Sequence, residues 1–280
     1  MRKDMLTTVN GLEFNYVHHG VGPTLVLLHA FPLNYRMWEP QITGLNDMCH
    51  VLALDMRGFG ASEATDGDFT IENLADDLHA LMQHLGHERF VLGGSSMGGY
   101  VAMAYAERYP EDLMGLALIA TRATADTPEK REERLKTAAS VSAFTPATLA
   151  KTMAPTMFAP EYSKERPNGL LSAVRAWISG TPPLTIAGAQ RAMANRPDRT
   201  QVLAGFQEPV LVIAGEQDQI MPPDAADQMV EVLPYATLVR VPNAGHLPNM
   251  EQPEIVNQAL RQFMKQFTPK PAAHTPSRQT

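Results

Sequence analysis

The chain has 280 residues, of which 44% are hydrophobic, and this is enough to bury the core of one large α/β domain or two small ones. Its 23 Lys and Arg against 30 Asp and Glu give a formal charge of -7, and no basic patch stands out, so we expect no nucleic-acid partner. No apolar stretch has the length of a secretory signal or a bilayer span, so we expect a cytoplasmic protein that does not associate with membranes. Cys49 is the single cysteine, which excludes an intrachain disulfide and a zinc site built on several thiolates.

Short apolar runs alternate with segments of helical period along most of the chain. The runs are residues 25–28, 51–54, 90–92, 116–119, 210–213 and 238–241. Runs of this kind are typical of strands buried on both faces, and residues 74–85 and 256–267 between or after them have the period of amphipathic helices. Asn10-Gly11 predicts a hairpin between residues 5–9 and 12–17. The pattern predicts an α/β fold whose mostly parallel sheet begins antiparallel and carries helices on both faces.

The alternation stops between Arg122 and Ala204, where residues 128–141 and 170–178 have helical patterns. We expect residues 122–204 to form a helical cap inserted into one core domain, which comprises residues 1–121 and 205–267. Residues 268–280 are rich in Pro and polar side chains and have little to bury, so they are predicted to form a flexible tail.

A candidate nucleophile lies in Gly94-Ser95-Ser96-Met97-Gly98, between an apolar run and a helical segment. A G-x-S-x-G motif in this context predicts a sharp turn that exposes Ser96 at the carboxyl edge of the sheet, at the positive end of a helix dipole. Ser95 is the competing candidate, but centring the motif on Ser95 puts Met97 where the second glycine belongs.

A serine nucleophile needs a base that titrates near neutrality, and imidazole fits. His246 follows the last predicted strand, so it should lie at the same sheet edge as Ser96. Asp218 follows the strand predicted at residues 210–213 and is the preferred acid to orient His246. Glu216 in the same loop and Asp126 after the preceding strand stay open as alternatives.

The chain resembles the α/β-hydrolase family from residue 12 to residue 267. Residues 25–32 are similar to the family's strand followed by His-Gly-x-Pro, with Ala30 in place of the glycine. The resemblance implies an oxyanion hole made by the backbone N–H groups of Phe31 and Met97, and the order Ser, Asp, His along the chain is the family's order. His29 is predicted to brace this loop rather than to act as a second base.

Within the family, residues 32–34 and 96–100 and the compact cap resemble 3-oxoadipate enol-lactonases and small carboxylesterases. This resemblance implies that Ser96, His246 and Asp218 hydrolyse a small carboxylic ester or lactone without a cofactor or a metal. Two alternatives keep the same triad: cofactor-free perhydrolase or haloperoxidase activity, and a ligand sensor that signals through a partner protein. The oligomeric state stays open.

The cap also offers candidate substrate-binding residues. A hydrophobic acyl or alcohol site fits its flexible apolar side chains, although most of them are expected to be cap core. Arg122 could pair with a substrate carboxylate, although a surface charge is the favoured interpretation. The apolar candidates are Phe144, Met153, Met157, Phe158 and Trp177, with Trp38 and Phe31 at the entrance.

Overall fold

The computed structural model describes residues 4–65, 68–140, 145–162 and 169–268, and its centre is one eight-stranded sheet in the order β1-β2-β4-β3-β5-β6-β7-β8. All neighbours from β4 to β8 are parallel, whereas β2 pairs antiparallel with both β1 and β4. The predicted α/β class with a mostly parallel sheet is therefore confirmed. The strands are β1 (Met5–Val9), β2 (Leu12–His19), β3 (Thr24–Leu28), β4 (His50–Leu54), β5 (Phe90–Ser95), β6 (Leu113–Ile119), β7 (Val210–Gly215) and β8 (Ala236–Val241).

The hairpin predicted from Asn10-Gly11 joins β1 to β2. Both turn residues have positive φ, 53° at Asn10 and 79° at Gly11, as a two-residue turn between twisted strands requires. The tail predicted after residue 267 lies outside the described residues apart from Thr268.

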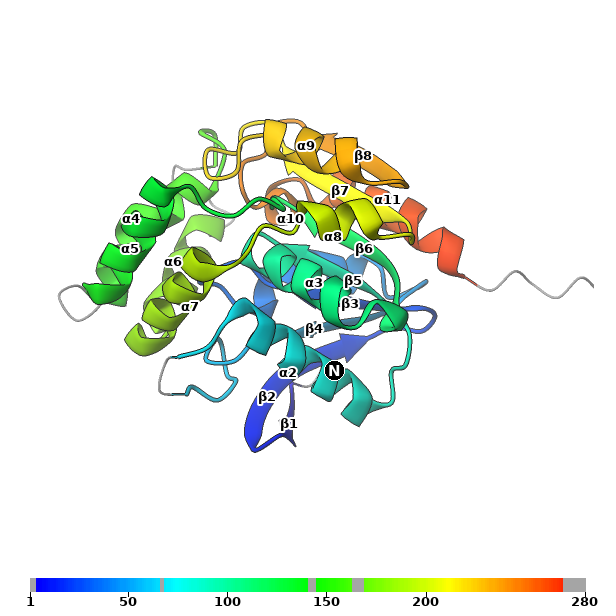
Figure 1. Ribbon diagram of the computed structural model, residues 1–280, viewed down its shortest axis with the longest axis horizontal. Coiled ribbons are helices and arrows are strands. Elements are labelled where there is room, and N and C mark those ends of the chain that lie inside the picture. Colours follow the sequence, from blue (N-terminus) through cyan, green and yellow to red (C-terminus); the bar gives the residue numbers. More distant parts are fainter. Residues whose placement is uncertain (1–3, 66–67, 141–144, 163–168, 269–280) are drawn as a thin grey trace, which may run out of the picture.

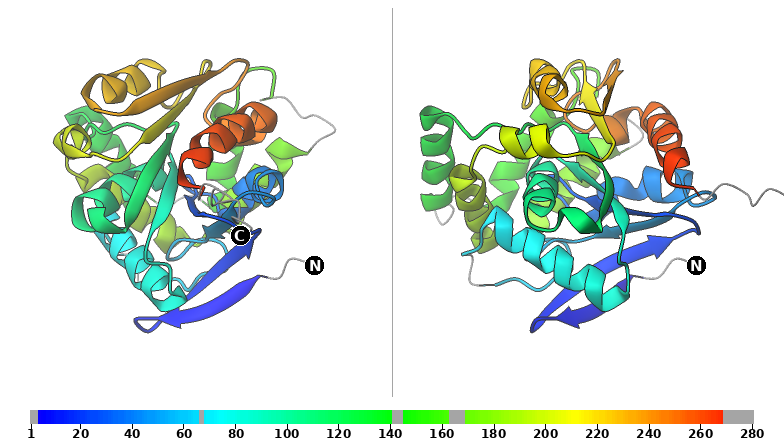
Figure 2. Two further views of the ribbon diagram at one scale, coloured as in Figure 1. Left: turned by 90° about the vertical axis from the view of Figure 1, so that its right-hand side faces the viewer. Right: turned by 45° about the vertical axis from the view of Figure 1, so that its right-hand side comes forward.

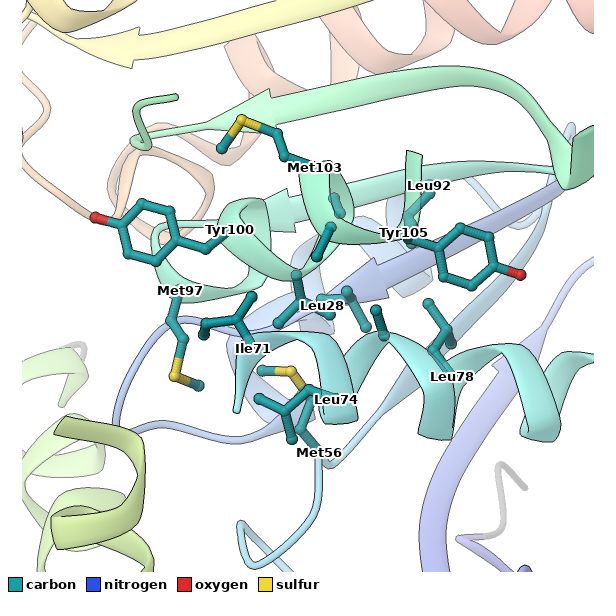
Figure 3. Close-up of a cluster of buried hydrophobic side chains, with 14 of the residues drawn as sticks. Leu28, Met56, Ile71, Leu74, Leu78, Leu92, Met97, Tyr100, Met103 and Tyr105 are labelled. Atoms are coloured by element: carbon teal, nitrogen blue, oxygen red, sulfur yellow. The ribbon is translucent and has the colours of Figure 1, made fainter. Parts of the chain in front are cut away.

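Helices cover both faces of the sheet (Figure 2). One face packs on α2 (Ile71–Leu85), α3 (Met97–Arg108), α8 (Thr200–Gly205) and α9 (Asp224–Val232), and the other on α1 (Glu39–Gly44) and α11 (Pro253–Met264). Figure 3 shows the first of these cores, where Leu28 of β3 lies between α3 and Leu74 and Leu78 of α2. Four short helices also belong to this part of the chain: η1 (Tyr35–Trp38), η2 (Pro110–Asp112), α10 (Pro248–Glu251) and η4 (Lys265–Phe267).

The strand β8 corrects one expectation. The apolar run at residues 238–241 predicts burial on both faces, but only Val241 is fully buried and most of the strand is half-buried or exposed. The reason is position, because β8 forms an edge of the sheet and pairs only with β7. Apolar side chains on an edge strand shield one face of the sheet without being enclosed.

A group of helices between β6 and β7 gathers at one end of the molecule (Figure 1). They are α4 (Pro128–Ala139), α5 (Pro146–Met153), η3 (Ala154–Met157), α6 (Leu170–Gly180) and α7 (Pro183–Asn195). Within this group α4 packs on α7 and α5 packs on α6, an arrangement that favours the proposed cap. The helix α8, which falls inside the predicted cap, packs instead on α3 and α9, so its position favours a cap that ends before Thr200. Along the described part of the chain, no helix combines the length and apolar character that crossing a bilayer needs.

Candidate active site

Ser96 lies between β5 and α3 in a strained backbone conformation. Its φ of 53° and ψ of -111° lie in a region that a residue with a Cβ rarely adopts, at a cost of about 1–3 kcal/mol. The flanking glycines allow the turn: a Cβ at Gly94 would lie 2.2 Å from the Gly98 carbonyl oxygen, and one at Gly98 would lie 2.4 Å from the carbonyl oxygen of Leu28. The main chain of Ser96 is held from the next strand, since its N–H donates to Ile119 at 2.9 Å and its carbonyl accepts from the Thr121 hydroxyl at 2.8 Å.

Ser95 and Ser96 differ in how far each is buried. Ser95 is the last residue of β5, and its hydroxyl is completely buried without a hydrogen-bond partner within the described part of the chain. Ser96 is half-buried. Only Ser96 therefore has a side chain that a ligand outside the core could reach, which supports the choice made from the motif spacing.

Asp218 and His246 form a buried pair at the ends of β7 and β8. The distance from His246 Nδ1 to Asp218 Oδ2 is 2.8 Å, and the two side chains are 2% and 1% exposed. The other carboxylate oxygen, Asp218 Oδ1, accepts the backbone N–H groups of Ile220 and Met221, each at 2.8 Å. Asp218 is thus fixed by its own loop. In the neutral imidazole tautomer that donates through Nδ1 to this carboxylate, the other nitrogen, Nε2, is an acceptor.

The two alternative acids are placed differently. Glu216 is exposed. The side chain of Asp126 is completely buried, and its carboxylate contacts three guanidinium groups, those of Arg122 at 2.5 Å, Arg134 at 2.6 Å and Arg196 at 2.9 Å. Arg122 is accordingly an ion-paired residue that is 23% exposed, rather than an isolated surface charge.

The loop after β3 carries Phe31, one of the two predicted oxyanion donors. His29 braces this loop as predicted: its Nδ1 lies 3.0 Å from the Ala30 carbonyl oxygen, and its Nε2 accepts the Met56 N–H at 3.0 Å. Burial lowers the pKa of His29 to about 4, so the imidazole is neutral. Met97, the second predicted donor, begins α3, where the first N–H groups of a helix have no acceptor within that helix.

Asp55 shapes the neighbouring loop. Its carboxylate accepts the N–H groups of Tyr35 at 2.7 Å and Ala61 at 2.9 Å and the Asn15 amide at 2.8 Å. Burial raises the pKa of Asp55. These bonds give Asp55 a structural role, because they join the turn at residues 55–62 to Asn15 of β2 and Tyr35 of η1.

The candidate substrate-binding residues are mostly core. Trp38, Met157 and Phe158 are completely buried in the core on the α1 and α11 side, and Met153 and Trp177 are packed against it. Trp177 also lines a pocket of about 250 Å³ with Asp55 and Thr181. Phe144 lies outside the described residues. A role for these residues in substrate binding stays a prediction.

One buried acid near the site was missed in the sequence. Glu251 ends α10 and binds three backbone N–H groups, two of them next to His246 in the chain. Its position five residues after the candidate base was the available signal, but spacing alone does not reveal which amides a carboxylate contacts.

Comparisons with known proteins identify the fold family of the chain. The model of the alpha/beta hydrolase fold family matches residues 23–253. A 3-oxoadipate enol-lactonase of Acinetobacter baylyi is 30% identical over 95% of this chain and 97% of its own. Among solved structures, a malate-bound thermophilic esterase from Thermogutta terrifontis is 39% identical, with a TM-score of 0.89 over 96% of this chain and 100% of its own. The enol-lactonase of Burkholderia xenovorans LB400 is 29% identical, with a TM-score of 0.86 over 93% and 100%. The chain therefore belongs to the α/β-hydrolase fold family, and it is a hydrolase.

Proposed function

We propose that this hydrolase cleaves a small carboxylic ester or lactone through an acyl-enzyme at Ser96. The observation that carries the proposal is the shared sheet edge: a strained, accessible Ser96 follows β5, and the buried Asp218–His246 pair follows β7 and β8. Parallel strands present their carboxyl ends at one edge, where α/β proteins place their ligands.

In the proposed reaction, His246 Nε2 accepts the proton of the Ser96 hydroxyl while Oγ bonds to the substrate carbonyl carbon. Asp218 keeps the Nδ1 proton in place and stabilises the imidazolium. The tetrahedral oxyanion accepts hydrogen bonds from the backbone N–H groups of Phe31 and Met97, and each bond stabilises the transition state by about 3 kcal/mol. His246 then gives its proton to the leaving alkoxide as the carbonyl–oxygen bond breaks, and water hydrolyses the acyl-enzyme by the same steps.

The relatives support an ester or lactone as substrate. The enol-lactonase from A. baylyi and the esterase from T. terrifontis align with nearly the whole chain, including the region between β6 and β7 that we propose as the cap. In this proposal, Trp177 and the apolar side chains packed with it contact the acyl or alcohol group of the substrate. Substrate choice within the family resides mainly in such caps rather than in the triad.

Fluorophosphonate labelling tests the proposal. The reagent should modify Ser96 of the wild-type protein, and Ser96→Ala should abolish both labelling and hydrolysis. Ser95→Ala is the matched control, and it should keep both because its hydroxyl is enclosed in the core. An adduct at another residue, or no adduct, would contradict the mechanism.

The substrate class needs a second experiment. A series of p-nitrophenyl esters of increasing acyl length, assayed beside enol-lactones, separates an esterase from a lactonase. Bromination in acetate and peroxide at a rate that exceeds ester hydrolysis would instead favour the perhydrolase alternative. Slow turnover of every ester, with ligand-dependent capture of a partner protein, would favour the sensor.

A further inference from the structure

Glu251 is a buried carboxylate that the proposed mechanism does not use. It is 4% exposed, and its carboxylate accepts three backbone amides. Its Oε1 accepts the N–H of Gly245 at 2.9 Å and that of Leu247 at 3.3 Å, so it holds the residues on both sides of His246. We call residues 242–247 the histidine loop.

The second oxygen of Glu251 reaches a different part of the chain. Oε2 accepts the N–H of Ala159 at 2.7 Å. Ala159 closes the cap segment, which we define as residues 157–159 and which lies at the end of η3, between α5 and α6. One carboxylate therefore links the cap segment to the histidine loop.

Two further contacts show how closely the two segments fit. The His246 N–H donates to the Met157 carbonyl oxygen at 3.0 Å. A Cβ at Gly245 would lie 2.4 Å from the Ala159 nitrogen and 2.5 Å from the Phe158 carbonyl carbon, so only a glycine permits this approach. The backbone of His246 is thus supported by the cap segment, whereas its imidazole is oriented by Asp218 in the core.

We propose that Glu251 is a positioning residue that fixes the imidazole of His246 by joining the cap segment to the histidine loop. The proposal rests on the proposed function, in which His246 is the base. A carboxylate suits the task because it offers two oxygens and only acceptor sites, whereas a glutamine must turn its NH₂ group toward at least one of these three N–H donors.

Glu251 can hold all three amides only in its ionised form, so its pKa sets the pH range in which it can position His246. Burial is the main cause that raises its pKa to about 7, with a smaller contribution from the negative charge of Asp218, while the three amides act in the opposite direction. The cap segment itself, Met157-Phe158-Ala159, brings no charged side chain to the carboxylate. Assays at pH 8 and above therefore keep the accepting form dominant.

The test compares Glu251→Gln with Glu254→Gln, an exposed acid three residues along the chain. At pH 8, we expect Glu251→Gln to lower kcat by about 10- to 100-fold with KM changed less than about threefold, because a small displacement of a catalytic group has effects of this size. Its rate of fluorophosphonate labelling at Ser96 should fall by a similar factor. Glu254→Gln should match the wild type in both assays.

Proton NMR separates positioning from a general loss of structure. The hydrogen-bonded Nδ1 proton of His246 should give a downfield signal in the wild type and in Glu254→Gln. In Glu251→Gln this signal should broaden or vanish at a temperature where circular dichroism shows a folded protein. An unchanged signal with unchanged kcat overturns the proposal.

Hydrogen exchange on the wild-type protein covers the case in which Glu251→Gln does not fold. If Glu251 joins the segments, the amides of Ala159, Gly245 and Leu247 should open together and share one protection factor. Fast exchange at Ala159 with protected Gly245 and Leu247 overturns the proposal. The two hypotheses fail differently: absence of wild-type labelling at Ser96 refutes the proposed function, whereas wild-type labelling that Glu251→Gln leaves unchanged refutes only the role of Glu251.

Discussion

Replacing Asp218 by asparagine tests the proposed orientation of His246 with little change in shape. In the wild type, Oδ2 lies 2.8 Å from His246 Nδ1, and Oδ1 accepts two backbone N–H groups. The asparagine side chain in Asp218→Asn would keep its oxygen on those two amides, because its NH₂ group cannot accept them. The NH₂ group would then face His246 Nδ1 and donate to it, which forces the imidazole proton onto Nε2.

A protonated Nε2 cannot take the proton of Ser96. The same exchange of Asp for Asn in a chymotrypsin-like triad lowers kcat by about 10⁴, which corresponds to about 5.5 kcal/mol of transition-state stabilisation. We expect a loss of this order for Asp218→Asn with p-nitrophenyl acetate, and an unchanged KM. The unfolding temperature should change little, since the amide satisfies the same backbone donors.

Glu216→Gln is the matched control, because Glu216 belongs to the same loop, was the alternative acid and is exposed. It should keep kcat within about twofold, as expected for a surface change away from the reacting groups. A kcat for Asp218→Asn above about one tenth of the wild-type value would refute the orientation argument. So would a loss in Glu216→Gln as large as that in Asp218→Asn.

Three further predictions concern stability. His29 has a pKa of about 4 in the folded protein and 6.5 in the unfolded chain, so its contribution to the free energy of unfolding is complete above pH 6.5 and is lost as the pH falls to 4. In urea titrations between these pH values, the free energy of unfolding of the wild type should fall by up to about 3 kcal/mol more than that of His29→Gln. Gly94→Ala should prevent the turn at Ser96 and abolish activity. Gly180→Ala at the end of α6, where an added Cβ would meet nothing within 4 Å, should instead raise the free energy of unfolding by about 0.5 kcal/mol. Equal effects of the two substitutions would contradict the close packing at Gly94. Asp126→Asn leaves three guanidinium groups without their anion and should cost about 3–5 kcal/mol in a urea titration, while Asp227→Asn, in an exposed pair with Arg240, should cost less than about 1 kcal/mol.

The sheet could be predicted because its information is local. Runs such as residues 25–28 and 210–213 are apolar without interruption, and this pattern indicates a strand enclosed on both faces wherever it lies in the sheet. The wrong expectation for β8 arose because residues 238–241 have a similar composition, although β8 is the last strand of the sheet and pairs on one side only. Strand order depends on pairing between distant segments, which periodicity does not encode.

In the candidate site too, features specified by nearby residues could be predicted, and contacts between distant segments could not. The turn at Ser96 is specified by its own neighbours, because Gly94 and Gly98 are needed within a few residues of the serine. Pairing Asp218 with His246 needed one additional rule, that the ends of adjacent parallel strands meet at one edge, and the 2.8 Å contact agrees with that rule. Glu251 could not be found in this way, since its third amide belongs to Ala159, 92 residues away.

The placement of His246 between two supports has a consequence for specificity. Its imidazole is oriented by Asp218, which belongs to the core, whereas its backbone donates to Met157 of the cap segment. Phe158, next to Met157, is one of the side chains proposed to contact the substrate. A substrate that displaces Phe158 would therefore also strain the hydrogen bond that His246, the proposed base, donates to Met157. We accordingly expect poorly fitting esters to lose kcat as well as affinity, because the proposed recognition in the cap and the proposed proton transfer at His246 depend on the same stretch of backbone.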